Sequence, residues 1–129
     1  MERSSIERVE AWKKAFVEAE GAIRSAEVAY EKAEESYDVA NVAMTFAETM
    51  YSTRGASVTD ARNARRYAKS LWKKAIIKHR VAKGKREVAK RAMHESDKAL
   101  EEIDPYDRVA AERLNQGDIL ELLERARML

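Results

Sequence analysis

An uninterrupted seven-residue apolar repeat fills residues 9–51, VEAWKKAFVEAEGAIRSAEVAYEKAEESYDVANVAMTFAETMY. Alternating steps of three and four residues meet thirteen apolar side chains in succession, with no charge among them. Large residues hold one set of these positions, and alanine holds the other set after Trp12. A strict repeat of this length predicts one long helix in a coiled coil. Because alanine leaves room for another backbone, the partner helix must come close.

Length and composition favour a single helical domain covering residues 1–129. Alanine fills 22 positions and charged residues make up 37%, which is typical of long helices. The absence of cysteine excludes disulfides and thiolate metal sites. The first residues lack the apolar core of a signal peptide, and no run approaches the ~20 apolar residues of a membrane span. We therefore expect a soluble, cytoplasmic protein with no membrane partner.

Helix start and stop signals divide the chain into four helices, at residues 5–52, 58–103, 105–115 and 118–128. Ser4 or Ser5 can cap the first helix, and Gly55 can adopt the left-handed conformation that ends it. Ser57 or Thr59 can cap the second helix, which must return antiparallel because the link is short. The sequence thus predicts an all-α fold. It is a long antiparallel alanine-rich helical hairpin (a coiled coil) with a short C-terminal helical segment packed at its open end.

The second helix continues the repeat at Ala61, Ala64, Ala68, Leu71, Ala75, His79, Ala82, Arg86, Ala89, Met93, Ser96, Leu100 and Ile103. The alternation slips once, near Ala75, where two steps of four come together. A turn near residue 55 pairs residue numbers that sum to about 111, which places Ile23 beside Ala89. Gly21 keeps its place inside the first helix, and we interpret it as a position of close packing.

The net charge of +2 is unevenly distributed along the chain. Residues 1–53 hold 6 basic and 11 acidic side chains, residues 54–94 hold 14 and 2, and residues 95–129 hold 5 and 10. Pairing in the hairpin lays the acidic run at 18–38 along the basic run at 73–91. We therefore expect salt bridges between the helices to neutralise part of the positive charge, although each exposed pair stabilises little.

A second apolar stripe lies near the turn, off the main repeat, and we name it the tip stripe: Val39, Val42, Phe46 and Met50. Glu48 is the one charge between residues 39 and 53. Exposed apolar stripes on helices usually mark protein interfaces, so these four residues are predicted to bind a partner. Trp72, Ile76 and Ile77 lie on faces of the second helix that the repeat does not use. We expect them to lack a partner within the hairpin.

Eight basic residues at helical spacing form what we name the basic stripe: Arg62, Arg65, Arg66, Lys69, Lys73, Arg80, Lys83 and Lys90. Such a stripe can follow a phosphate backbone and bind DNA or RNA in a strongly salt-dependent way. The outer face of a coiled coil is often equally charged, and no known DNA-binding motif accompanies this stripe. A solvated helix face is therefore the alternative interpretation.

The sequence holds no clear constellation for catalysis or metal binding. The two histidines, His79 and His94, lack ligand spacing, and we interpret His79 as a polar residue of the helix seam. The acidic residues lie among lysines and arginines, away from the dry paired setting that acid–base catalysis needs. Tyr30, Tyr37 and Tyr51 follow the repeat, so their hydroxyls are expected at the edge of the seam, where water is available. We expect no enzymatic activity and no cofactor.

Two functions from different classes fit these features. The first is a non-enzymatic protein–protein interaction or assembly module. Such a module forms a homodimer, or binds a dedicated protein partner, through the tip stripe. The alternative is an accessory or inhibitor protein that binds a nucleic acid or a nucleoprotein complex through the basic stripe.

Overall fold

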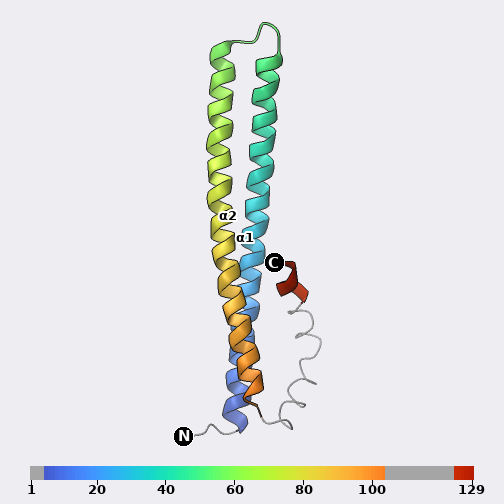
Figure 1. The fold of residues 1–129 in the computed structure, drawn as a ribbon, viewed down its shortest axis with the longest axis vertical. Helices are drawn as coiled ribbons and strands as arrows, with labels where there is room; N and C mark the ends of the chain where they lie inside the picture. Colours follow the sequence, from blue (N-terminus) through green and yellow to red (C-terminus); the bar gives the residue numbers. More distant parts are fainter. Residues whose placement is uncertain (1–4, 104–123) are drawn as a thin grey trace. The chain divides into compact units, whose positions relative to one another are not determined.

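Two long helices make up most of the structure (Figure 1), a computed structural model that describes residues 5–103 and 124–129. α1 spans Ser5–Ser52 and α2 spans Val58–Glu101, and the two helices pack against each other in opposite directions. This is the predicted all-α helical hairpin. The predicted helix at 105–115 lies outside the described residues. So do residues 118–123 of the last predicted helix, whereas residues 124–128 are helical.

Local hydrogen bonds and one glycine set the helix ends. α1 has the predicted bounds, and Gly55 takes a φ of 88° in the turn that follows it. The Ser57 hydroxyl oxygen accepts from the backbone N–H of Asp60 at 3.3 Å, which is the expected cap of α2. At the other end, the N–H of Ile103 donates to the carbonyl of Leu100, three residues back. This tightened last turn ends α2 at Glu101, two residues before the predicted end.

Two rows of side chains at seven-residue spacing form the buried seam between the helices. The α1 row is Trp12, Ala19, Ala26, Ala33, Ala40 and Ala47, and the α2 row is Ala61, Ala68, Ala75, Ala82, Ala89, Ser96 and Ile103. Every member is at most 4% exposed, so the repeat is confirmed on both helices. The α2 row keeps its spacing through Ala75, and the slip seen in the sequence therefore affects only the positions beside it.

Side chains that flank the seam rows differ in size on the two faces of the hairpin. Four residues after each seam position, α1 carries a large residue such as Tyr30 or Tyr37. These residues meet the equivalent positions of α2. The ring centroids of Tyr37 and Trp72 lie 5.1 Å apart, and those of Tyr30 and His79 lie 5.9 Å apart. We name this side the large-residue face.

The opposite side, which we name the small-residue face, is built from the positions three residues after each seam position. In α1 these are Ala15, Ala22, Ala29, Ser36, Ala43 and Met50, and in α2 they are Ala64, Leu71, Lys78, Lys85, Ala92 and Ala99. Since the large rows of the two helices meet on one side, these smaller rows share the other. Seven of the twelve are alanine, so this face presents little side-chain bulk above the seam.

The structure divides into two compact units, and the first comprises Met1–Glu27 and Gly84–Leu129. Its core contains Ile23 and Ala89 in one cluster, as the pairing rule predicted. Trp12 and Ile103 form a second cluster.

The C-terminal residues dock in this first unit. Ala126 and Leu129 pack against the cluster that contains Ile23 and Ala89, and the Arg125 guanidinium forms a salt bridge with the Glu27 carboxylate. Nη1 of Arg86 donates to the backbone carbonyl of Leu129 at 3.4 Å. Apolar packing and two charge-assisted contacts therefore hold residues 125–129 in the first unit. Most of the segment that was predicted to pack at the open end of the hairpin lies outside the described residues.

The second unit, Val28–Lys83, contains the turn and an aromatic cluster on the large-residue face. Tyr37 contacts both Trp72 and His79 edge-on, and Tyr30 contacts His79. His79 is thus a residue of the helix seam, as predicted. The expectation that Trp72 lacks a partner within the hairpin is wrong, because its ring packs against Tyr37. Ile76 is half-buried, whereas Ile77 is exposed.

Three further expectations are wrong, each for a local reason. Gly21 is not closely packed, since a Cβ built on it would meet nothing within 4 Å. The Tyr30 hydroxyl does not reach the wet edge of the seam, because it is buried without a hydrogen-bond partner. Among the described residues, no salt bridge joins the acidic run at 18–38 to the basic run at 73–91. On the large-residue face, the aromatic rings lie between the two sets of charges and keep them apart.

Candidate interaction surfaces

Possible metal ligands do not cluster in the described part of the chain. No group of three or more histidine, aspartate or glutamate side chains there is placed to hold a metal ion. His79 lies between two tyrosine rings, and His94 is exposed on α2. No helix among the described residues is both long and apolar enough to cross a bilayer. Exposed side chains of the second unit form two candidate interaction surfaces.

The tip stripe is accessible on α1. Val39, Val42 and Phe46 are 54%, 72% and 62% exposed, and Met50 is half-buried beside the seam. Val39 and Phe46 each follow a seam alanine by six residues, while Met50 follows one by three. These offsets place all three on the side of the small-residue face, and Val42 lies at its outer edge.

α2 contributes exposed apolar residues to the same side, and the sequence analysis did not recognise them. Tyr67 and Val81 follow seam alanines by six residues and are 64% and 52% exposed. Ile77 follows one by two residues, as Val42 does on α1, and is 59% exposed. These residues could have been found from the sequence, because they follow seam residues of α2 by the same number of positions as Val39, Val42 and Phe46 do on α1.

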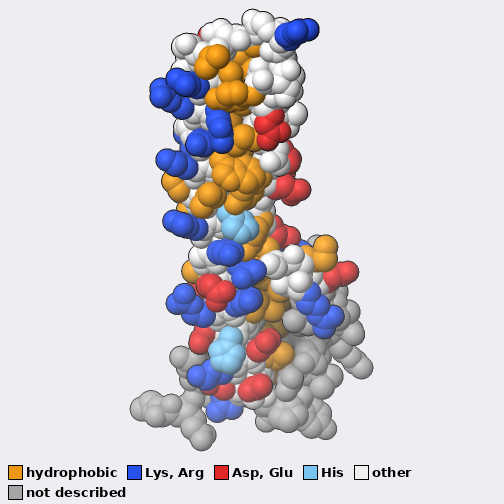
Figure 2. Space-filling model, turned by 45° about the horizontal axis from the view of Figure 1, so that its top comes forward, with side chains coloured by type: hydrophobic (Ala, Val, Ile, Leu, Met, Phe, Trp, Pro, Cys, Tyr) orange, Lys and Arg blue, Asp and Glu red, His pale blue; other side chains and the backbone are white. Residues whose placement is uncertain are grey.

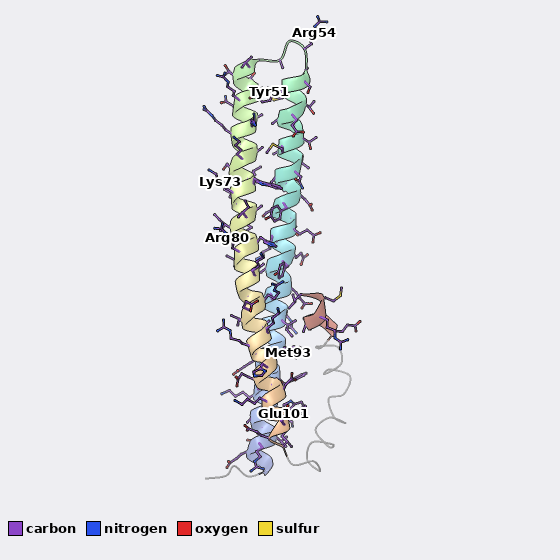
Figure 3. The ribbon with its side chains drawn as sticks, in the orientation of Figure 1. Tyr51, Arg54, Lys73, Arg80, Met93 and Glu101 are labelled. Carbon is purple, nitrogen blue, oxygen red and sulfur yellow. The ribbon has the colours of Figure 1, made fainter. Side chains whose placement is uncertain are left out.

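The basic stripe is also exposed, and all but one of its members belong to the second unit. Residues 61–83 contain nine basic side chains and no acidic one. None of the basic-stripe residues in this unit forms a salt bridge with a described carboxylate, whereas Lys90, in the first unit, lies 4.0 Å from Glu87. Lys73 and Arg80 extend from the side of α2 turned away from α1 (Figure 3). These cations can therefore meet an external anion.

Acidic residues of α1 limit where that anion could lie. Glu31, Glu34, Asp38 and Glu48 are exposed, and their offsets from the seam place them towards the large-residue face. Figure 2 shows lysine and arginine along one edge of this face, and aspartate and glutamate along the other edge. Hydrophobic side chains and histidine lie between the two edges. A polyanion would therefore be confined to the α2 edge, because the α1 edge repels it.

The two surfaces differ in chemistry and lie on opposite faces of the second unit. One is largely apolar with few charges of mixed sign, while the other is an edge of cations that pair with no described carboxylate. Comparison of the chain with protein-family models, with curated proteins and with solved structures gave no match.

Proposed function

We propose that the protein is a non-enzymatic protein–protein interaction module that forms a homodimer through the tip stripe. The observation that carries this proposal is the exposure of Val39, Val42 and Phe46, each more than half accessible, along one side of α1. Apolar area of this kind is costly to leave in water and is a common mark of interfaces. Two-fold pairing of identical patches is the commonest way in which soluble proteins cover it.

Sedimentation velocity combined with light scattering tests the homodimer. We expect the wild-type protein to be dimeric at micromolar concentration and the Phe46→Glu variant to be monomeric with unchanged helicity. Thr45→Glu is the matched control, because it adds the same charge one residue away at an exposed position directed to the other face. A wild-type protein that stays monomeric at several hundred micromolar would rule out the homodimer. Unfolding of Phe46→Glu would instead place Phe46 in the core of the monomer.

A second function, binding of a nucleic acid or a nucleoprotein complex, is favoured by a separate observation. The basic-stripe residues of the second unit are exposed and have no carboxylate partner among the described residues. Cations that bind phosphates release counterions, so the affinity of such a complex falls steeply as salt rises. The stripe has no element that reads base edges, and its binding would therefore be independent of sequence.

Fluorescence anisotropy with labelled DNA and RNA oligonucleotides tests this second function. We expect binding at low salt that weakens steeply at moderate salt and is lost in the Arg62→Glu, Arg66→Glu double variant. Lys13→Glu with Lys14→Glu is the matched control, since it makes the same charge change at exposed positions on α1 in the first unit. Absence of binding by the wild-type protein at low salt would remove this function.

A further inference from the structure

The small-residue face of the second unit carries most of its exposed apolar side chains. Val39 and Phe46 of α1 and Tyr67 and Val81 of α2 lie on this face, and Val28, Val42 and Ile77 lie at its outer edge. Three further exposed hydrophobics of this unit, Tyr51, Val58 and Trp72, occupy the large-residue offset. The apolar surface is therefore a property of a two-helix face rather than of one stripe on α1.

Half-buried residues beside the seam line the middle of this face. Ala43 and Met50 of α1, and Ala64 and Leu71 of α2, flank the seam there and are half-buried. Phe46 and Tyr67 lie outside them on the two helices, so exposed aromatic side chains border a half-buried strip in which alanine alternates with Met50 and Leu71. A surface of this form accepts a helix whose own side chains interdigitate with the strip.

The charges on this face are few and mixed in sign. At the offsets that form it, the second unit carries Lys32, Lys74 and Lys78 together with Glu35 and Asp60. A polyanion would gain little here, and a strongly acidic or basic protein would find no complementary field. Two identical copies of the face, by contrast, can meet without a block of like charge.

We propose that a second copy of this chain docks on the small-residue face, with its own small-residue face, so that four helices pack together. This inference rests on the homodimer proposed above and adds Tyr67, Leu71, Ile77 and Val81 of α2 to the interface. The described C-terminal residues pack in the first unit, where Ala126 and Leu129 contact the cluster that contains Ile23 and Ala89.

The size of the surface agrees with a stable dimer. Phe46 and Tyr67, at 62% and 64% exposure, expose roughly 250 Å² at about 200 Å² per aromatic side chain. Five aliphatic side chains, from 44% to 72% exposed, extend the patch. Together they approach the ~800 Å² that each partner loses in an interface of standard size. The tip stripe alone would leave the α2 half of this surface in water.

Four variants measured by sedimentation equilibrium separate the two-helix face from the tip stripe. Phe46→Glu and Tyr67→Glu place a carboxylate on the α1 half and the α2 half of the face. Thr45→Glu and Thr59→Glu place it at exposed positions of the same helices outside that face. We expect the first two to raise the dissociation constant of the dimer by about tenfold or more, because a buried unpaired carboxylate is costly. The two controls should stay within about twofold of wild type.

The outcomes divide cleanly between the two proposals. Dissociation by Phe46→Glu but not by Tyr67→Glu or Val81→Glu would overturn the two-helix face and leave the homodimer through the tip stripe standing. A monomeric wild-type protein would overturn both proposals. Sedimentation of that monomer with neutral phosphatidylcholine vesicles, lost in Phe46→Glu and Tyr67→Glu, would assign the face to a membrane surface instead. Far-UV circular dichroism shows whether each variant is folded, and Val81→Glu replaces Tyr67→Glu if the latter unfolds.

Discussion

Alanine at the seam positions lets the two helices approach more closely than a larger side chain would allow. Ala26, Ala33 and Ala40 are 0–1% exposed although each offers only one methyl group. Their burial comes from the nearness of the opposite helix, and the larger residues four positions on then close the seam from one side. Size, more than hydrophobicity, is therefore the property that these positions select.

Enlarging a seam residue should destabilise the protein. In Ala33→Leu, three added carbons have no space between the helices, and we expect a loss of about 1–3 kcal/mol in the free energy of unfolding. Asn41→Leu adds an apolar side chain at an exposed position of α1 and should change stability by less than about 0.5 kcal/mol. Urea unfolding followed by circular dichroism measures both. An unchanged or raised melting temperature in Ala33→Leu would show that the seam is not closely packed.

The hydroxyl of Tyr30 is a buried polar group without a hydrogen-bond partner. Folding therefore removes it from water without compensation. Tyr30→Phe deletes that oxygen and keeps the ring contact with His79, and we expect a gain of up to about 1 kcal/mol. Tyr37→Phe should give no such gain, since no buried, unpaired hydroxyl is found there. A loss of stability in Tyr30→Phe, measured by urea unfolding, would imply a bound water or another partner at this oxygen.

Replacing glycine by alanine should have opposite effects on stability at the turn and within a helix. Gly55 has a φ of 88°, where an L side chain costs about 1–2 kcal/mol, so Gly55→Ala should lower stability by that amount. Gly84 lies within α2, where an added Cβ would meet nothing within 4 Å, and Gly84→Ala should raise stability by about 0.5–1 kcal/mol. Thermal unfolding of the two single variants measures whether each substitution raises or lowers the stability of the protein. Equal effects would mean that backbone conformation is not what distinguishes the two positions.

The elements were predictable because their signals are local and periodic. Seven-residue spacing identified the buried rows, and Gly55 with Ser57 located the turn. The difference between the large-residue face and the small-residue face was harder to predict from the sequence. It depends on which row of α1 beside the seam packs against which row of α2. The contact between Tyr37 and Trp72 settles that point. The missing salt bridges between the described parts of the two helices have the same origin, since the rings that meet on this face hold the charged rows apart.

For the molecule as a whole, stability should depend on protein concentration. Because only folded chains form the dimer, mass action raises the melting temperature by about 3 °C for each tenfold increase in concentration of a chain of this length. Phe46→Glu should abolish that dependence, whereas Thr45→Glu should retain it. Differential scanning calorimetry over two decades of concentration measures both effects. If the melting temperature of the wild-type protein does not depend on concentration, the protein is a monomer that does not use its exposed face for self-association.

The antiparallel pairing of α1 with α2 also sets the order in which the chain can fold during synthesis. Residues near the turn have their partners within a few positions, whereas Ile23 must wait for Ala89. At about 5–20 residues per second, the ribosome needs roughly 3–13 s to make the intervening chain. During that time the N-terminal half of α1 has no partner from its own chain, and its apolar row is open to the same row of a neighbouring nascent chain. We therefore expect the hairpin to close from the turn outward, with the N-terminal half of α1 protected last from proteases.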